Sequence, residues 1–293
     1  MSDHNIISKG NKGGYVTLRF NNSGSSWLHE ANVTGETVNS MRIVNALWSA
    51  NGVADAVGSS YYANAVRFDG TNDYLTRGAD LTGNGDTQAL MGSFWINFKG
   101  GDGSEQYIYN AQGTNSGGLW ITKTTGNKIS IQAKAYTGAA MCNMVSGSTF
   151  VASGGWNHIL WDWYGASSGR GNIYVNDSDD SPAFTNNNAA LVQMVQANHS
   201  VGSDTSGNGK LYADIADFGI YWTTSDIATE SNRRPFISGA GKPVDLGSDG
   251  SKGPTTPKVF FTGETASWHT NAGTGGGFTE NGALTDGTDS PSD

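Results

Sequence analysis

Short segments with the alternation of a β-strand recur between residues 64 and 224, and they constrain the chain to an all-β fold. Phe94, Ile96 and Phe98 alternate along one such segment, so their side chains would share one face of a strand. Trp95 would point to the opposite face. Gly, Asn, Asp and Ser separate the segments, and the 42 glycines of the chain suit many tight turns. We therefore predict a β-sandwich made of many short strands.

Individual hairpins and one helix can be placed within this pattern. Residues 117–136 are predicted to form a hairpin with Thr-Gly-Asn-Lys as its turn, and residues 154–165 pair with residues 169–180. A single helix is predicted over residues 225–239, with Ser225 as its N-cap. The fold should therefore contain very little helix.

The chain divides into three predicted regions. Residues 1–60 are expected to form a small β-rich attachment module, because residues 13–20 alternate like a half-buried strand and residues 41–52 are an apolar run ending in an Asn-Gly turn. Residues 61–239 are expected to form the sandwich. Residues 240–293 read as an extended, Gly/Pro-rich tail whose short strands pack on the sandwich.

Charge and cysteine usage exclude several classes of function. The net charge is −9 and no basic stripe is present, so neither nucleic acid nor an anionic membrane surface is an expected partner. Cys142 is the only cysteine, which excludes an intrachain disulfide. The polar first residues do not read as a signal peptide, and no stretch of 18 apolar residues is present to span a membrane.

Five segments, taken in order, resemble the strands of concanavalin A-like lectin/glucanase and laminin G-like domains. They are VRFDGTNDYL (66–75), FWINF (94–98), GGWNHILWDWY (154–164), NIYVND (172–177) and YADIADFGIYWTTSDIATE (212–230). The resemblance covers roughly residues 64–232 and implies a concanavalin A-like jelly-roll β-sandwich.

A second resemblance concerns the C-terminal run from residue 236 to residue 293. Its GKPVDLG sequence, an aromatic strand and the GGGFT sequence are similar to the tail that follows this sandwich in many bacteriophage structural proteins. The resemblance implies a structural protein of a bacteriophage virion.

The sequence lacks the carboxylate spacing of a glycoside hydrolase built on this fold. Such hydrolases carry Glu-x-Asp-x-Glu on one strand, so that alternation brings all three side chains to one face. No two of the six glutamates lie two or four residues apart, and no Gly-x-Ser-x-Gly elbow lies between a strand and a helix. We expect His158 to be packed, Asp214 to cap a turn or bond the backbone, and Asp217 to support the fold. The chain is therefore predicted not to be an enzyme.

Two kinds of binding site have candidate residues. Asp177, Asp179 and Asp180 form the densest carboxylate cluster, and such oxygens in a loop suit Ca²⁺, although a solvated acidic turn is the commoner explanation. Trp120 and Trp268 are the candidate aromatic platforms for a glycan, although most aromatic side chains in such a fold serve packing.

Together these features predict a non-enzymatic surface protein of a bacteriophage virion, made in the host cytoplasm. It would be a capsid decoration protein or head fibre that displays a lectin-like domain. Residues 1–60 would contact the major capsid protein or another virion protein, and a homo-oligomer is expected. The alternative is a tail adhesin that recognises a host surface glycan. A glycan depolymerase is a third hypothesis, which requires two carboxyl groups about 5–9 Å apart.

Overall fold

The computed structural model describes residues 5–9, 15–19, 61–113, 115–166, 169–181 and 190–293. The chain separates into two compact units, residues 1–59 and residues 60–293. In the first unit, β1 (Asn5–Lys9) and β2 (Tyr15–Arg19) form an antiparallel hairpin, which confirms the strand predicted within residues 13–20. The apolar run over residues 41–52 lies outside the described residues.

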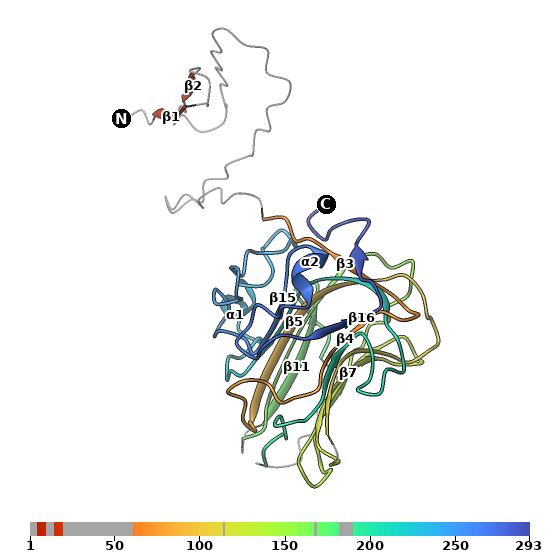
Figure 1. The fold of residues 1–293 in the computed structure, drawn as a ribbon. Helices are drawn as coiled ribbons and strands as arrows, with labels where there is room; N and C mark the ends of the chain where they lie inside the picture. The colour runs from red at the N-terminus through yellow and green to blue at the C-terminus, as the bar shows by residue number, and fades with distance from the viewer. Residues whose placement is uncertain (1–4, 10–14, 20–60, 114, 167–168, 182–189) are drawn as a thin grey trace. The chain divides into compact units, whose positions relative to one another are not determined.

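The second unit is a sandwich of two antiparallel sheets (Figure 1). The first has the order β12-β11-β10-β5-β14-β3-β17, with β15 also paired to β14, and is called here the eight-stranded sheet. Its strands are β3 (Val66–Asp69), β5 (Ala89–Phe98), β10 (Asn157–Tyr164), β11 (Arg170–Val175), β12 (Ser178–Asp179), β14 (Tyr212–Tyr221), β15 (Val259–Phe261) and β17 (Thr285–Asp286).

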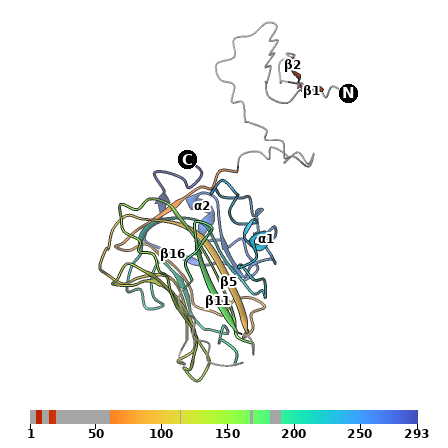
Figure 2. The ribbon, with the colours of Figure 1, turned by 180° about the vertical axis from the view of Figure 1, so that it is seen from behind.

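The second sheet has the order β16-β4-β13-β6-β7-β8-β9 and is called here the seven-stranded sheet. Its strands are β4 (Tyr74–Arg77), β6 (Gln106–Gln112), β7 (Gly118–Lys123), β8 (Ile129–Lys134), β9 (Ala140–Val145), β13 (His199–Val201) and β16 (Thr279–Asn281). The two views in Figures 1 and 2 show the sheets stacked face to face. The all-β sandwich and both predicted strand pairs are confirmed, since β7 pairs with β8 and β10 pairs with β11.

Apolar side chains from both sheets meet between them and form the main core. Phe94, Ile96 and Phe98 of β5 enter this core, whereas Trp95 lies in a separate cluster on the opposite face, which confirms the predicted alternation. One inward row of the seven-stranded sheet consists of Leu75, Val201, Tyr109, Ile121, Ile131 and Met144. The residue next to each of these must therefore point outward, which gives Thr76, Ser200, Asn110, Trp120, Gln132 and Asn143.

The outward faces of the two sheets differ. The chain itself covers the eight-stranded sheet: Met91 and Leu160 pack against Phe236 and Leu246 from the segment after β14. The outward residues of the seven-stranded sheet belong to none of the hydrophobic clusters formed by the described residues. Among the described residues, the outward face of the seven-stranded sheet is therefore the more polar of the two outward faces.

The predicted helix over residues 225–239 is wrong in length. The structure has only α1 (Glu230–Arg233), with Thr229 as its N-cap in place of Ser225. Asp226 accepts a hydrogen bond from the backbone N–H of Ala228, which holds a turn where the helix was expected to begin. A second short helix, α2 (Thr265–Trp268), was not predicted. No helix of the described residues is long and apolar enough to cross a membrane.

Candidate functional site

One row of side chains crosses the seven-stranded sheet on its outward face and can form hydrogen bonds at every strand. From one edge of the sheet to the other, its members are Thr279, Thr76, Ser200, Asn110, Trp120, Gln132 and Asn143. We call this set the polar row. It contains one aromatic ring, and no residue in it is charged.

The part of the polar row around Trp120 has the chemistry of a sugar-binding surface. Trp120 of β7 is paired with Asn110 of β6 on one side and with Gln132 of β8 on the other, and Gln132 is paired with Asn143 of β9. Asn110 is buried, Trp120 and Gln132 are half-buried, and Asn143 is exposed. Four strands at the usual sheet spacing extend over about 14 Å. The Asn110 amide is engaged by Leu119 and Thr205, so the accessible amides are those of Gln132 and Asn143. An aromatic face beside amides that both donate and accept suits a ligand rich in hydroxyl groups.

The local backbone decides where the Trp120 ring lies. A Cβ atom added at Gly118 would sit 3.3 Å from Cη2 of Trp120 and 2.0 Å from the carbonyl oxygen of Ala111. Because Gly118 also has φ near +141°, only glycine fits there, and the indole lies beside bare backbone. The Nζ atom of Lys134 lies 5.0 Å from the centroid of the Trp120 ring. The aromatic surface therefore has a cation next to it.

Two amide oxygens near this face lack hydrogen-bond donors among the described residues. Asn115 Oδ1 and Gln196 Oε1 are both buried and unpartnered, and they lie 3.6 Å and 2.8 Å from the point that a Cβ atom at Gly113 would occupy. Gln196 cannot simply reverse its amide, because its Nε2 already donates to the carbonyl oxygen of Gln193. A hydroxyl group or an ordered water would satisfy such acceptors.

The structure uses two of the predicted calcium ligands for other contacts. Asp177 accepts hydrogen bonds at 2.6 Å from both Arg233 and Arg234. Burial would raise the pKa of Asp177, but the two guanidinium groups outweigh it, and its pKa is lowered. Asp180 accepts bonds from the backbone N–H and the hydroxyl of Ser148. These carboxylates are thus occupied by different partners.

Asp179, the third predicted ligand, accepts a hydrogen bond from the backbone N–H of Ser181 and is exposed. Within the described parts of the chain, no three His, Cys, Asp or Glu side chains gather closely enough to hold a metal ion. Calcium binding stays a prediction, without geometric support from these residues.

The two predicted glycan-binding tryptophans differ in their exposure to solvent. Trp268 has no exposed surface; its ring stacks on Phe261 at 5.5 Å and meets Phe68 edge-on at 6.0 Å. The prediction that Trp268 is a glycan platform is wrong, because α2 directs this side chain into the main core. Trp120 is half-exposed in the polar row. Sequence reasoning missed the amides beside it, and only the register between strands could have revealed them.

The buried Ser93–His158 pair does not form an accessible catalytic site. Ser93 Oγ lies 3.0 Å from His158 Nε2, and neither residue is exposed by more than 2%. Burial lowers the pKa of His158 to about 3, so the ring is neutral at ordinary pH. The ring stacks on Trp95 at 4.8 Å. The expectation of a packed structural histidine is confirmed.

The two aspartates of β14 also have structural roles. Asp214 is buried and forms ion pairs with Arg67 at 2.6 Å and Lys99 at 3.1 Å, so its predicted turn-capping role is wrong. Asp217 is buried and accepts hydrogen bonds at 2.7 Å from the hydroxyls of Tyr61 and Thr262. Both carboxylates are therefore held inside the domain.

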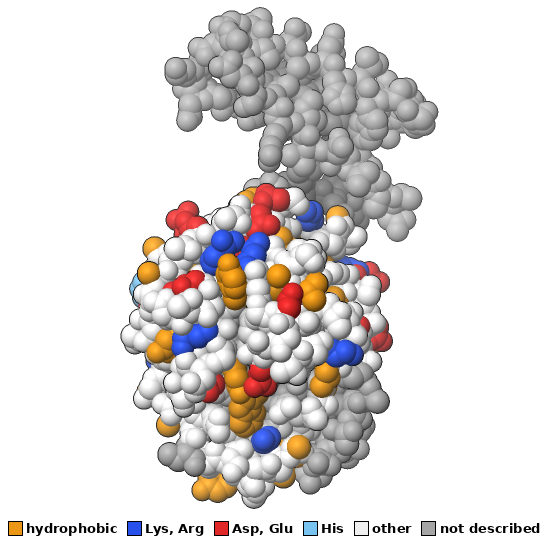
Figure 3. Space-filling model, turned by 90° about the vertical axis from the view of Figure 1, so that its right-hand side faces the viewer, with side chains coloured by type: hydrophobic (Ala, Val, Ile, Leu, Met, Phe, Trp, Pro, Cys, Tyr) orange, Lys and Arg blue, Asp and Glu red, His pale blue; other side chains and the backbone are white. Residues whose placement is uncertain are grey.

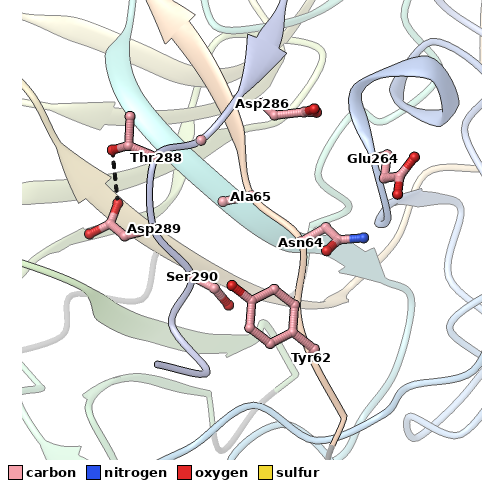
Figure 4. Close-up of a pocket in the computed structure, with 9 residues that line it drawn as sticks. Tyr62, Asn64, Ala65, Glu264, Asp286, Thr288, Asp289 and Ser290 are labelled. Carbon is pink, nitrogen blue, oxygen red and sulfur yellow. Dashed lines mark hydrogen bonds between the residues drawn. The ribbon is translucent and has the colours of Figure 1, made fainter. Parts of the chain in front are cut away.

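A shallow cavity of about 220 Å³ lies beside β17 (Figure 4). Acidic side chains from Glu264, Asp286 and Asp289 surround it, together with Tyr62. Asp286 is engaged by Thr265, and the cavity is smaller than the usual ligand pocket of about 300–1,000 Å³. The outward face of the seven-stranded sheet is the better candidate site.

Figure 3 views the molecule from the side on which β4 and β7 lie in Figure 1. Uncharged polar and backbone atoms dominate this side, with scattered charged and apolar groups. A surface of this kind favours hydrogen bonding over hydrophobic docking.

No protein-family model matches the chain, and no curated protein matches its sequence. Among solved structures, a candidate carbohydrate-binding protein from Bacteroides ovatus is similar, with a TM-score of 0.55 and 12% identity. The match covers 78% of this chain and 60% of that chain. A pentraxin from Limulus polyphemus matches with a TM-score of 0.49 and 11% identity, over 77% of this chain and 95% of that one. Domains LG4–5 of the mouse laminin α1 chain match with a TM-score of 0.42 and 14% identity, over 55% and 42%.

These similarities concern the fold. Residues 60–293 have a concanavalin A-like jelly-roll fold, as the sequence resemblance implied.

Proposed function

We propose that residues 60–293 are a non-enzymatic, lectin-like domain that binds carbohydrate through the polar row. The observation that carries this proposal is the placement of Trp120 beside Gln132 and Asn143 on an outward sheet face. The similar protein from Bacteroides ovatus, a candidate carbohydrate-binding protein, supports the same ligand class. A function still has to be argued from the site, because one fold hosts many functions.

The composition of the site supports binding over catalysis. The polar row offers amides, hydroxyls and an indole, whereas a glycoside hydrolase needs two carboxyl groups flanking the substrate. Asp162, Asp177 and Asp214 are engaged in ion pairs with arginine or lysine. We therefore propose recognition of a glycan without its cleavage.

We also propose that the domain is displayed on a bacteriophage virion, as a capsid decoration protein or head fibre. The resemblance of residues 236–293 to the tails of phage structural proteins supports this role. Residues 1–59 form a separate compact unit, which suits an attachment module. In this proposal the first unit contacts the capsid and the second faces the surroundings.

Carbohydrate binding is tested on an array of bacterial surface polysaccharides with the full chain. Trp120→Ala is expected to lower binding by at least about tenfold, because stacking on the indole is lost. Tyr62→Ala is the control, since it removes an aromatic side chain that is 54% exposed but lies outside the polar row. If no polysaccharide is bound, or if Trp120→Ala binds like the unmodified chain, the proposed function is wrong.

The virion role is tested by electron cryo-microscopy of purified particles together with mass spectrometry. Density for the sandwich over the capsid lattice would support decoration. Density at the tail alone would replace decoration by a receptor-binding adhesin. The absence of the chain from purified virions would refute both roles.

A further inference from the structure

We infer that the glycan bound by the polar row carries carboxylate groups, as polysaccharides of uronic acids do, and that Lys134 recognises them. This inference rests on the proposed function and adds the chemical class of the ligand. It starts from the position of one cation.

Lys134 lies on the outward face, two residues after Gln132 on β8, and its side chain is half-buried. In the seven-stranded sheet, the strand residues that share the outward face with the polar row are otherwise uncharged. They are Tyr74, Tyr107, Gln112, Gly118, Thr122, Ser130, Ala140, Val145 and Asn281. Among the described strand residues on this face, Lys134 is therefore the one that carries a charge.

Some other lysines of the domain are paired with acids, whereas Lys134 is not. Lys99 pairs with Asp214 and Asp289, and Lys123 pairs with Asp102. The chain has 26 acidic and 17 basic residues, so acidic partners are plentiful. No carboxylate of the described residues lies within ion-pair distance of Lys134, and its Nζ atom lies over the Trp120 ring. Its ammonium group is thus available to a ligand.

The geometry around Trp120 suits a ring that carries a carboxylate. Nζ of Lys134 lies over the indole, 5.0 Å from the ring centroid, so a sugar that stacks there would displace the ammonium group sideways and keep it within reach of an equatorial substituent. A carboxylate there would accept a charge-assisted hydrogen bond, which is shorter and stronger than a neutral one. Hydroxyl groups of the same or the next sugar would meet Gln132 and Asn143.

Nearby acidic groups do not neutralise this position. One acidic loop beside the polar row begins at Asp204, whose carboxylate accepts bonds from the backbone of Ser206 and Asn208. That loop contacts Asn110 through Thr205, on the opposite side of Trp120 from β8. The acidic chain as a whole repels an acidic glycan, so binding of such a ligand requires a local cation of this kind.

The experiment uses an array on which each uronic-acid polysaccharide is printed beside its carboxyl-reduced, neutral counterpart. The unmodified chain is expected to prefer the acidic member of a pair by about tenfold, which corresponds to about 1.4 kcal/mol. Lys134→Gln should remove this preference. Lys134→Arg should retain it, because the charge remains.

Lys210→Gln is the matched control. Nζ of Lys210 also lies over an aromatic ring of this sheet, 4.1 Å from the centroid of Tyr74. Tyr74 belongs to β4, which lies three strands, or about 14 Å, from β7. Lys210→Gln should not change the preference. Equal binding of acidic and neutral members by the unmodified chain, or an unchanged preference in Lys134→Gln, would overturn the inference while leaving the proposed function intact. Binding to neither member of any pair would refute both.

Discussion

Asp217 is expected to make the domain less stable as the pH rises, and Asp217→Asn should remove this effect. The carboxyl group is only 2% exposed and sits in the bulge of β14 between Ala216 and Gly219. Its Oδ1 atom accepts bonds from Tyr61 and Thr262, while Oδ2 is buried without a donor among the described residues. Burial raises its pKa from 3.8 to about 6.

The sign and size of the effect follow from this shift. The folded domain holds the Asp217 proton more tightly than the unfolded chain does, so the stabilisation is fully present below pH 3.8 and is lost as the pH rises to about 6. A difference of about two pKa units corresponds to about 3 kcal/mol of unfolding free energy. Well above pH 6 this stabilisation is fully lost, and the unfolding free energy no longer changes with pH through Asp217.

The asparagine variant should fold with the same geometry. Asp217 has φ of 49°, a region that asparagine tolerates well, and the amide oxygen can accept the same two hydroxyl bonds. The uncharged amide avoids burying a carboxylate. Asp217→Asn is therefore expected to be more stable than the unmodified domain by about 1–3 kcal/mol at pH 7.5 and nearly equal to it at pH 4.

Urea denaturation followed by tryptophan fluorescence at pH 4 to 8 measures both proteins. Asp249→Asn is the control, since Asp249 is only half-buried and its pKa is lowered by hydrogen bonds from Ser251. A difference in unfolding free energy between Asp217→Asn and the unmodified protein that is the same at pH 4 and pH 7.5 would refute the reasoning. So would a variant that is less stable at pH 7.5.

Three further results are expected. Trp268→Ala should destabilise the domain by about 3–5 kcal/mol in urea denaturation, because a large ring leaves the core; a loss below 1 kcal/mol would contradict its burial. Gly118→Ala should cost about 2 kcal/mol or more, because the new Cβ atom would clash with the Ala111 carbonyl oxygen at positive φ, and an unchanged melting temperature would count against this geometry. Adding Ca²⁺ after chelation should leave the melting temperature unchanged, because Asp177 is already paired with Arg233, whereas a rise of several degrees would restore the calcium hypothesis.

Much of the fold could be predicted because strand signals are local. The alternation that places Phe94 and Trp95 on opposite faces can be recognised from consecutive residues, and the structure confirms it. The hairpin over residues 117–136 is likewise local, with Asn127 at positive φ in its turn. The helix over residues 225–239 was overestimated, because side-chain contacts in the turn at Asp226 compete with helix formation.

The candidate site was only partly predictable. The sequence by itself determined the type of each residue and its alternation within a strand, and so it could mark Trp120 as a candidate. It could not rank Trp120 above Trp268, because burial depends on what packs from distant parts of the chain. Only the tertiary structure paired Asn110 with Trp120 and brought Asn143 into the same row, since the register between strands depends on contacts across the whole sheet. It also decided that the segments after β14 pack on the outward face of the eight-stranded sheet, because their apolar side chains meet Met91 and Leu160 there.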